Sequence, residues 1–109
     1  KMLGSEEFEQ MKTGTYFIAV SRGGLYDLDA LVQAISSGKL AGAGVDVTDP
    51  EPLPQGHPLW RLDNVIITPH IAGRSDKDRA RMVATIKKNV QRFVEGKPLI
   101  NVVDKRKGY

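Results

Sequence analysis

The hydrophobic residues of the chain fall into short continuous runs separated by stretches of helical spacing. The runs lie at 16–20, 41–47 and 64–68 and consist of small, β-branched or aromatic residues, which is typical of parallel-sheet strands. The first, Tyr-Phe-Ile-Ala-Val, is expected to be buried on both faces. The second should end near Asp46 or Val47, because the loop that follows holds four prolines, which forbid helix and inner strand.

Apolar residues at intervals of three or four predict three helices. The first should begin with Ser5 as its N-cap and end at Gly14, and the second should follow the N-cap Asp27 and end near 38. The longest should run from Ser75, with an acid three residues on, to a stop at Gly96. A short extended segment is expected at 99–103, before a frayed basic tail.

The order strand, helix, strand, loop, strand, long helix predicts an α/β fold with a parallel sheet and right-handed crossovers. Arg22, Glu51 and His70 follow the first, second and third strands. Ligands of open parallel sheets bind beyond the carboxyl ends of the strands, so these side chains are expected to meet at one edge.

Composition narrows the class of protein. The chain has 109 residues, 40% of them hydrophobic and 27% charged, which predicts one ordinary globular domain of a cytoplasmic protein without a membrane span. With 0 cysteines, disulfides, thiolate metal sites and thiol nucleophiles are excluded. The net charge of +3 invites a nucleic-acid interpretation, but much of the excess follows residue 74, where a solvated helix face is the better explanation.

Taken singly, each of the three ionisable residues has an ordinary structural interpretation. Arg22 before two glycines suits a turn, Glu51 between two prolines suits a rigid surface loop, and His70 suits a hydrogen-bonded strand end. Together they fit the reduction of a 2-keto acid. An arginine fork can hold the carboxylate, and a histidine beside a carboxylate can donate a proton near neutral pH. No side chain supplies a hydride, so a nicotinamide cofactor would bring it.

Other chemistries fit less well. His57 and His70 lie 13 positions apart without a regular acidic companion, so no metal site is predicted. Ser21 has no G-x-S-x-G elbow around it, which argues against a serine hydrolase.

Five motifs in order resemble the nucleotide-binding domain of the NAD(P)-dependent D-isomer-specific 2-hydroxyacid dehydrogenases. They are MKTG at 11–14, VSRGG at 20–24, GKLAGAGVDV at 38–47, EPLP with HPLW between 51 and 60, and NVI with TPH between 64 and 70. The likeness covers about residues 3 to 103. Among the subgroups, the loop around Glu51 looks most like glyoxylate/hydroxypyruvate reductases and phosphoglycerate dehydrogenase-like members.

The resemblance implies a role for each catalytic candidate. Arg22 matches the arginine that binds the substrate carboxylate and carbonyl. His70 matches the general acid in reduction and general base in oxidation. Glu51 matches the acidic partner that orients the imidazole and keeps it protonated.

The resemblance also implies contacts to NAD or NADP. Asp46 matches an aspartate near the nicotinamide carboxamide. Four residues match backbone positions that line the nicotinamide side of the cleft, namely Val20, Ser21, Ala72 and Gly73. Arg22 belongs to the same lining.

The chain departs from the family pattern in two residues and one motif. Ala19 stands where asparagine is usual, and Tyr26 stands where an aliphatic residue is usual. No G-x-G-x-x-G turn follows a strand, since Gly42-Ala43-Gly44 lacks both the third glycine and a following helix. The expected fold is therefore the C-terminal half of a Rossmann-like parallel sheet, with three strands, flanking helices and a long C-terminal helix.

These observations predict a partial NAD(P)-binding domain at 1–103 and a basic tail at 104–109. As a fragment of a 2-keto acid reductase, the isolated chain is expected to be inactive. An alternative from another class is a non-catalytic, cofactor-sensing or corepressor-like binding module. A bare strand edge and an apolar helix stripe also predict a homo-oligomer, with exchange of the long helix between chains.

Overall fold

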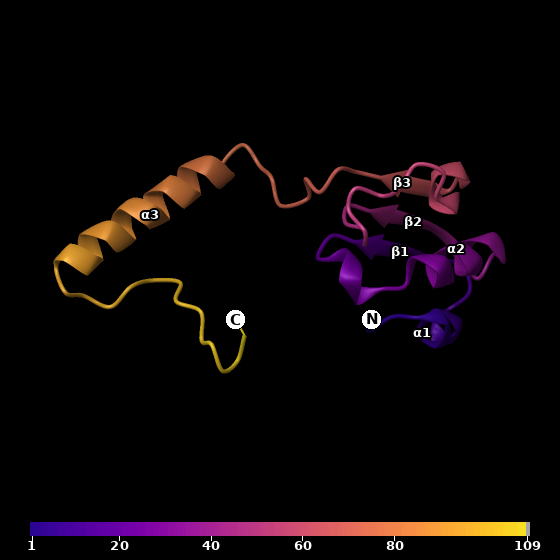
Figure 1. The fold of residues 1–109 in the computed structure, drawn as a ribbon, viewed down its shortest axis with the longest axis horizontal. Helices are drawn as coiled ribbons and strands as arrows, with labels where there is room; N and C mark the ends of the chain where they lie inside the picture. Colours follow the sequence, from indigo (N-terminus) through magenta and orange to yellow (C-terminus); the bar gives the residue numbers. More distant parts are fainter. Residues whose placement is uncertain (109) are drawn as a thin grey trace. The chain divides into compact units, whose positions relative to one another are not determined.

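The computed structural model describes residues 1–108, and Tyr109 lies outside the described part. The chain forms two compact units, Lys1–Gly73 and Arg74–Tyr109. The first unit carries the sheet, whose three parallel strands lie in the order β1-β2-β3 (Figure 1). The strands are β1 (Thr15–Ala19), β2 (Leu40–Val45) and β3 (Val65–Ile67). The predicted α/β class and parallel sheet are confirmed.

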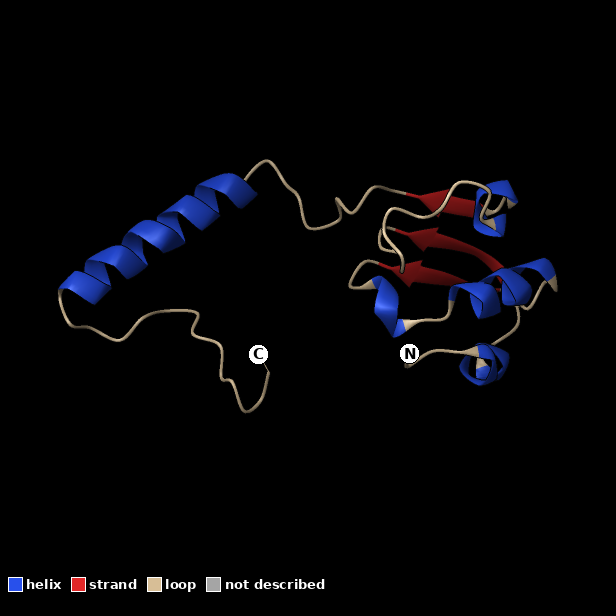
Figure 2. Ribbon diagram, viewed as in Figure 1, coloured by secondary structure: helices blue, strands red, loops and turns tan. Residues whose placement is uncertain are grey.

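Helices α1 (Ser5–Gln10) and α2 (Leu28–Ser36) pack against one another, and α2 packs on β2 (Figure 2). Asp27 is the N-cap of α2, as predicted, and its carboxylate accepts a hydrogen bond from the Ala30 amide at 2.9 Å. Two short 3₁₀ helices, η1 (Gly23–Leu25) and η2 (Pro58–Arg61), lie in the loops after β1 and β2. The core between sheet and helices is centred on Phe8, Tyr26, Leu31, Leu40, Val45, Val47 and Leu59.

The limits of α1 differ from the prediction at both ends. Gly4 is the N-cap in place of Ser5, because the Glu7 carboxylate reaches back to accept from the Gly4 amide at 2.8 Å. The helix ends at Gln10, and its C-cap Met11 has extended backbone. Gly14 lies in the following turn, where its φ of 83° suits a residue without a side chain.

The expectation that the first strand is buried on both faces was wrong. Alternate residues of β1 point to opposite faces of the sheet, and Tyr16 and Ile18 are 69% and 65% exposed. Ile66 of β3 is 70% exposed. Helix α2 covers only the other face, so the first unit presents an apolar sheet face made of Tyr16, Ile18, Val20 and Ile66.

The second unit is built around α3 (Asp78–Val94). Its N-cap is Lys77 rather than the predicted Ser75, because the Ser75 hydroxyl accepts from the Lys77 amide at 3.2 Å and forms a turn before the helix. Gly96, with φ of 65°, follows the end of the helix as predicted. The predicted apolar stripe is exposed in this unit, and it comprises Met82, Val83, Ile86, Val90, Phe93 and Val94.

Residues 99–103 form no strand, because the main-chain amide and carbonyl of Ile100 are both hydrogen-bonded to the Asn89 side chain. Its amide donates to the Ile100 carbonyl at 3.1 Å, and its oxygen accepts from the Ile100 amide at 2.8 Å. The part of the predicted frayed tail that is described forms a turn, in which the Asp104 carboxylate accepts from the Arg106 amide at 2.9 Å. In the described chain, no helix is both long and apolar enough to cross a membrane.

Candidate active site

The parallel sheet brings the three predicted catalytic residues to one edge. Strand β1 ends at Ala19 and leads to Arg22, β2 leads through the proline-rich loop to Glu51, and β3 leads to His70. The loop before Glu51 is held by the Thr48 hydroxyl, which donates to the Pro50 carbonyl at 2.9 Å. Prolines on both sides of Glu51 restrict its backbone further.

His70 lies between the other two side chains. Its Nδ1 is 2.8 Å from Glu51 Oε1, and its Nε2 is 3.4 Å from an Arg22 guanidinium nitrogen. The same Arg22 nitrogen donates to the Ser21 carbonyl at 2.7 Å. The His70 and Glu51 side chains are 42% and 39% exposed, so a small molecule has access to both.

These contacts fix which imidazole nitrogen is available for chemistry. An ionised carboxylate only accepts hydrogen bonds, so the Nδ1 that faces Glu51 carries a proton. Nε2 is then the atom that can exchange a proton with a ligand. Arg22 beside it presents donors in a planar fork, which suits a carboxylate and a neighbouring carbonyl oxygen. The arrangement can bind an acid and give a proton to its carbonyl oxygen or take one from its hydroxyl oxygen.

Asp46 holds the turn that carries His70. The residue is 4% exposed, and its carboxylate accepts from the Thr68 hydroxyl at 2.5 Å, the Ile71 amide at 2.9 Å and the Ala72 amide at 2.7 Å. His70 itself has φ of 54°, an uncommon left-handed backbone that its neighbours must stabilise. These three hydrogen bonds join Asp46 to residues on both sides of His70.

The surroundings of Asp46 also set its ionisation. Burial alone raises the pKa of the Asp46 carboxyl, but the hydrogen bonds from Thr68, Ile71 and Ala72 outweigh it. Together with the nearby charge of His70, they hold the pKa below its ordinary value. Asp46 therefore stays ionised and keeps its hold on the turn at neutral pH.

Thr68 is a site residue that the sequence reasoning missed. A threonine that follows a β-branched strand looks like a continuation of that strand, and nothing in the sequence marks its hydroxyl as a partner of Asp46. The available signal is its position two residues before His70, at the end of a strand that neighbours the strand of Asp46.

The residues predicted to contact a cofactor are brought together only in part. A hollow of about 270 Å³ on the exposed sheet face is lined by Val20, Asp46 and Ala72, with Ile18 and Ile66 among its apolar walls. Ser21, Arg22 and Gly73 do not line this hollow, although Ser21 contributes its carbonyl to Arg22.

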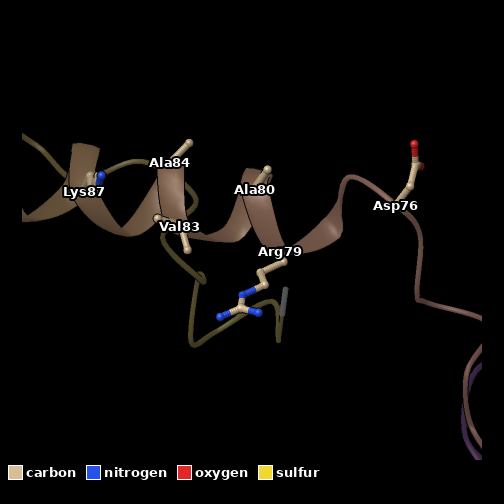
Figure 3. Close-up of a pocket in the computed structure, with 6 residues that line it drawn as sticks. All are labelled: Asp76, Arg79, Ala80, Val83, Ala84 and Lys87. Carbon is tan, nitrogen blue, oxygen red and sulfur yellow. The ribbon is translucent and has the colours of Figure 1, made fainter.

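Larger hollows also occur in the described part of the chain. One of about 530 Å³ borders Glu51 and is walled by Leu53, Trp60 and Ile67. Another, of about 620 Å³, runs along α3 between Asp76 and Lys87 (Figure 3). It is lined entirely by residues 76–87 and contains none of the ionisable groups that meet at His70, so size alone does not mark the site. Within residues 1–108, no group of three or more His, Asp or Glu residues is arranged to hold a metal ion.

Comparison with known proteins gives one consistent family. The family model described as D-isomer specific 2-hydroxyacid dehydrogenase, NAD binding domain, matches residues 1–72. The human glyoxylate reductase/hydroxypyruvate reductase is 44% identical over 92 residues, 84% of this chain and 28% of that protein. The glyoxylate reductase of Korarchaeum cryptofilum is 38% identical over 103 residues, 94% of this chain and 31% of that protein. The chain thus spans less than a third of either relative.

Solved structures agree. A D-isomer specific 2-hydroxyacid dehydrogenase from Xanthobacter autotrophicus Py2, in complex with NADPH and MES, superposes with a TM-score of 0.88 at 41% identity, over 99% of this chain and 44% of that one. An NADPH-dependent glyoxylate/hydroxypyruvate reductase from Sinorhizobium meliloti, in complex with NADP and sulfate, gives 0.86 at 34% identity, over 99% and 35%. Both are far above the similarity that a shared fold alone requires.

Proposed function

Since the chain belongs to the D-isomer specific 2-hydroxyacid dehydrogenases, we propose that it supplies the acid–base and carboxylate-binding groups of an NAD(P)-dependent 2-keto acid reductase. One observation carries the proposal: the imidazole of His70 is held between the Glu51 carboxylate and the Arg22 guanidinium. The substrate class is a small 2-keto acid, reduced to the corresponding D-2-hydroxy acid, or the reverse.

In this mechanism, Arg22 binds the substrate carboxylate through its paired donors. A carbonyl oxygen placed between Arg22 and His70 Nε2 would receive hydrogen bonds from both, in place of their present 3.4 Å contact. His70 then gives the Nε2 proton to that oxygen as the carbonyl carbon is reduced. Glu51 stabilises the protonated imidazole before the transfer and holds the ring afterwards. In the oxidation direction, Nε2 takes the hydroxyl proton.

A nicotinamide dinucleotide, when bound, supplies or accepts the hydride. The hollow on the sheet face fits the flat end of such a molecule, because Ile18, Val20 and Ile66 make its walls apolar. Gly44 also lines this hollow and leaves space in it, because a Cβ at this position would lie only 3.1 Å from the Ile18 side chain. Asp46 Oδ2 accepts one bond from the chain and retains capacity for a carboxamide donor. No residue of the chain forms the glycine-rich turn that grips a pyrophosphate.

The proposal extends to what the 109 residues do alone. Because they fit only the nicotinamide end of the cofactor, we expect the purified chain to reduce keto acids at no useful rate. Turnover by the chain alone with NADH or NADPH, abolished by His70→Ala, would overturn this part of the proposal.

The function itself is tested in a chimera. Residues 1–103 replace the matching segment of the Korarchaeum glyoxylate reductase, and oxidation of NADH or NADPH is followed with glyoxylate. Turnover is expected, and Arg22→Gln should raise KM for the acid more than Arg61→Gln, a matched change on η2. A chimera that binds the cofactor but turns nothing over would instead favour the cofactor-sensing module considered from the sequence.

Self-association is part of the same proposal. The unpaired edge of β1 and the apolar stripe of α3 are surfaces that a second copy could cover. We expect a homo-oligomer in which copies exchange α3, in the cytoplasm. Sedimentation of Ile18→Asp, beside the matched surface change Gln33→Asp on α2, tests this. A wild-type monomer at high concentration would contradict it.

A further inference from the structure

Tyr26 is a buried titratable residue that the proposed mechanism does not use. Its side chain is 1% exposed, and its ring packs edge to face against Phe17 with the ring centroids 5.2 Å apart. Its hydroxyl donates to the main-chain carbonyl of Val47 at 2.6 Å. An aliphatic residue of similar bulk could fill this space without a hydrogen bond, so the phenol calls for an explanation of its own.

The Tyr26 bond joins the two loops that carry the charged partners of His70. The first loop runs from Arg22 through η1 to Tyr26, and the second runs from Val47 to Glu51. They touch at a second point, where a Cβ built on Gly23 would lie only 2.1 Å from the Thr48 carbonyl group. We call these two contacts, Tyr26 on Val47 and Gly23 on Thr48, the latch.

The latch joins the two loops whose side chains, Arg22 and Glu51, lie beside His70. Arg22 is the neighbour of Gly23, and Glu51 follows Thr48 by three residues. These two side chains approach opposite nitrogens of the same imidazole. Any separation of the loops therefore changes the distance between the groups that face Nε2 and Nδ1.

We propose that Tyr26 is a positioning residue of the candidate site: by tying Val47 to the Arg22 loop, it keeps Glu51 on Nδ1 of His70 and so decides which imidazole nitrogen carries the proton. Glu51 and Tyr26 also interact electrostatically. Burial raises the pKa of the Tyr26 phenol to about 12, and the negative charge of Glu51 adds to the rise. The catalytic meaning of this role rests on the proposed function, but the role itself can be measured without substrate.

The test reads the tautomers of the two histidines by ¹⁵N NMR of the 109-residue chain at a pH where both rings are neutral. His70 is expected as the Nδ1–H form, because Nδ1 faces a carboxylate. His57 is expected as the Nε2–H form, because its Nδ1 accepts from the Leu59 amide at 3.2 Å. The two rings therefore give opposite patterns in one spectrum, and His57 is an internal reference.

Tyr26→Phe keeps the ring and removes only the hydroxyl. It should raise the ratio of Nε2–H to Nδ1–H forms of His70 by about threefold or more, the change expected when a charge-assisted hydrogen bond is partly lost. His57 should not change. Glu51→Ala marks complete loss of the selection.

Two controls separate positioning from stability. Tyr16→Phe removes a hydroxyl from an exposed tyrosine on β1 and should leave the His70 ratio at its wild-type value. Leu31→Ala opens a cavity in the core but removes neither contact of the latch, so it should lower stability without changing the ratio. A folded Tyr26→Phe protein with the wild-type ratio would overturn the proposal, and so would the same change in Leu31→Ala.

If Tyr26→Phe does not fold, the coupling is read from the other side. In Glu51→Gln, the onset of Tyr26 ionisation, followed by the ring carbon shift, should come at lower pH than in the wild type. An unchanged onset would overturn the proposal. Neither readout requires turnover, so a chimera without reductase activity would refute the proposed function and leave this test intact.

Discussion

Gly23→Ala is the substitution whose effect the structure defines most sharply. A Cβ at this position would lie 2.1 Å from both the carbonyl carbon and oxygen of Thr48, and 2.6 Å from the Asp49 amide nitrogen. Ordinary contacts are ~3.5 Å or longer, so the two backbones would have to separate by about 1.4 Å. Neither is a flexible side chain that can turn away. Overpacking of this kind costs about 1–3 kcal/mol, somewhat offset because alanine also restricts the unfolded chain.

Gly24→Ala is the matched control. There the nearest atom to a new Cβ is a carboxylate oxygen of Asp49 at 3.8 Å, an ordinary contact, so the restricted unfolded chain should make this variant neutral or slightly more stable. The urea-induced unfolding of both variants is followed by the fluorescence of Trp60, the single tryptophan. The Gly23→Ala midpoint should fall by about 1 M relative to Gly24→Ala, given typical urea slopes. Equal midpoints would refute the close approach of the two loops.

Three further outcomes follow from the core and from Asp46. Leu31→Ala, at a side chain with 0% exposure, should lower the free energy of unfolding by about 2–5 kcal/mol in the same urea assay, and a loss under about 1 kcal/mol would contradict its place in the core. Asp46→Asn should speed hydrogen exchange of the Ile71 and Ala72 amides by about tenfold, because the asparagine side chain has one accepting oxygen where the carboxylate has two. Unchanged exchange would show that Asp46 does not hold the turn at His70. The pKa of the Asp46 carboxyl is lowered in the folded state, so unfolding takes up a proton and stability should fall as pH drops below about 4. Urea midpoints between pH 5 and 3 check this, and Asp46→Asn should flatten the decline.

The strands and their functional edge were predictable because they depend on local pattern and one topological rule. Short β-branched runs gave β1 and β3 within a residue or two, and parallel strands bring their carboxyl ends to the same edge. Asp27 was recognisable because an N-cap acts within three residues of its own position. Arg22, Glu51 and His70 met for the same topological reason.

The parts that were not predictable depend on contacts between distant residues. Whether Ser5 or Gly4 begins α1 is decided by where the Glu7 carboxylate settles. An apolar run such as 16–20 has the same pattern whether one face or both are covered, so the exposed side of β1 could not be foreseen. The hydroxyls of Thr68 and Tyr26 find their partners, Asp46 and Val47, across 22 and 21 positions, which no periodicity encodes.

Whether His70 is the proton donor of a 2-keto acid reductase is decided by comparing the two histidines of the chain in the glyoxylate reductase chimera. His70→Asn should lower kcat for glyoxylate reduction by about 10²–10⁴-fold while reduced cofactor still binds. His57→Asn, which changes the loop histidine at the start of η2, should leave kcat unchanged. An active chimera in which the two variants retain the same kcat would contradict this role of His70.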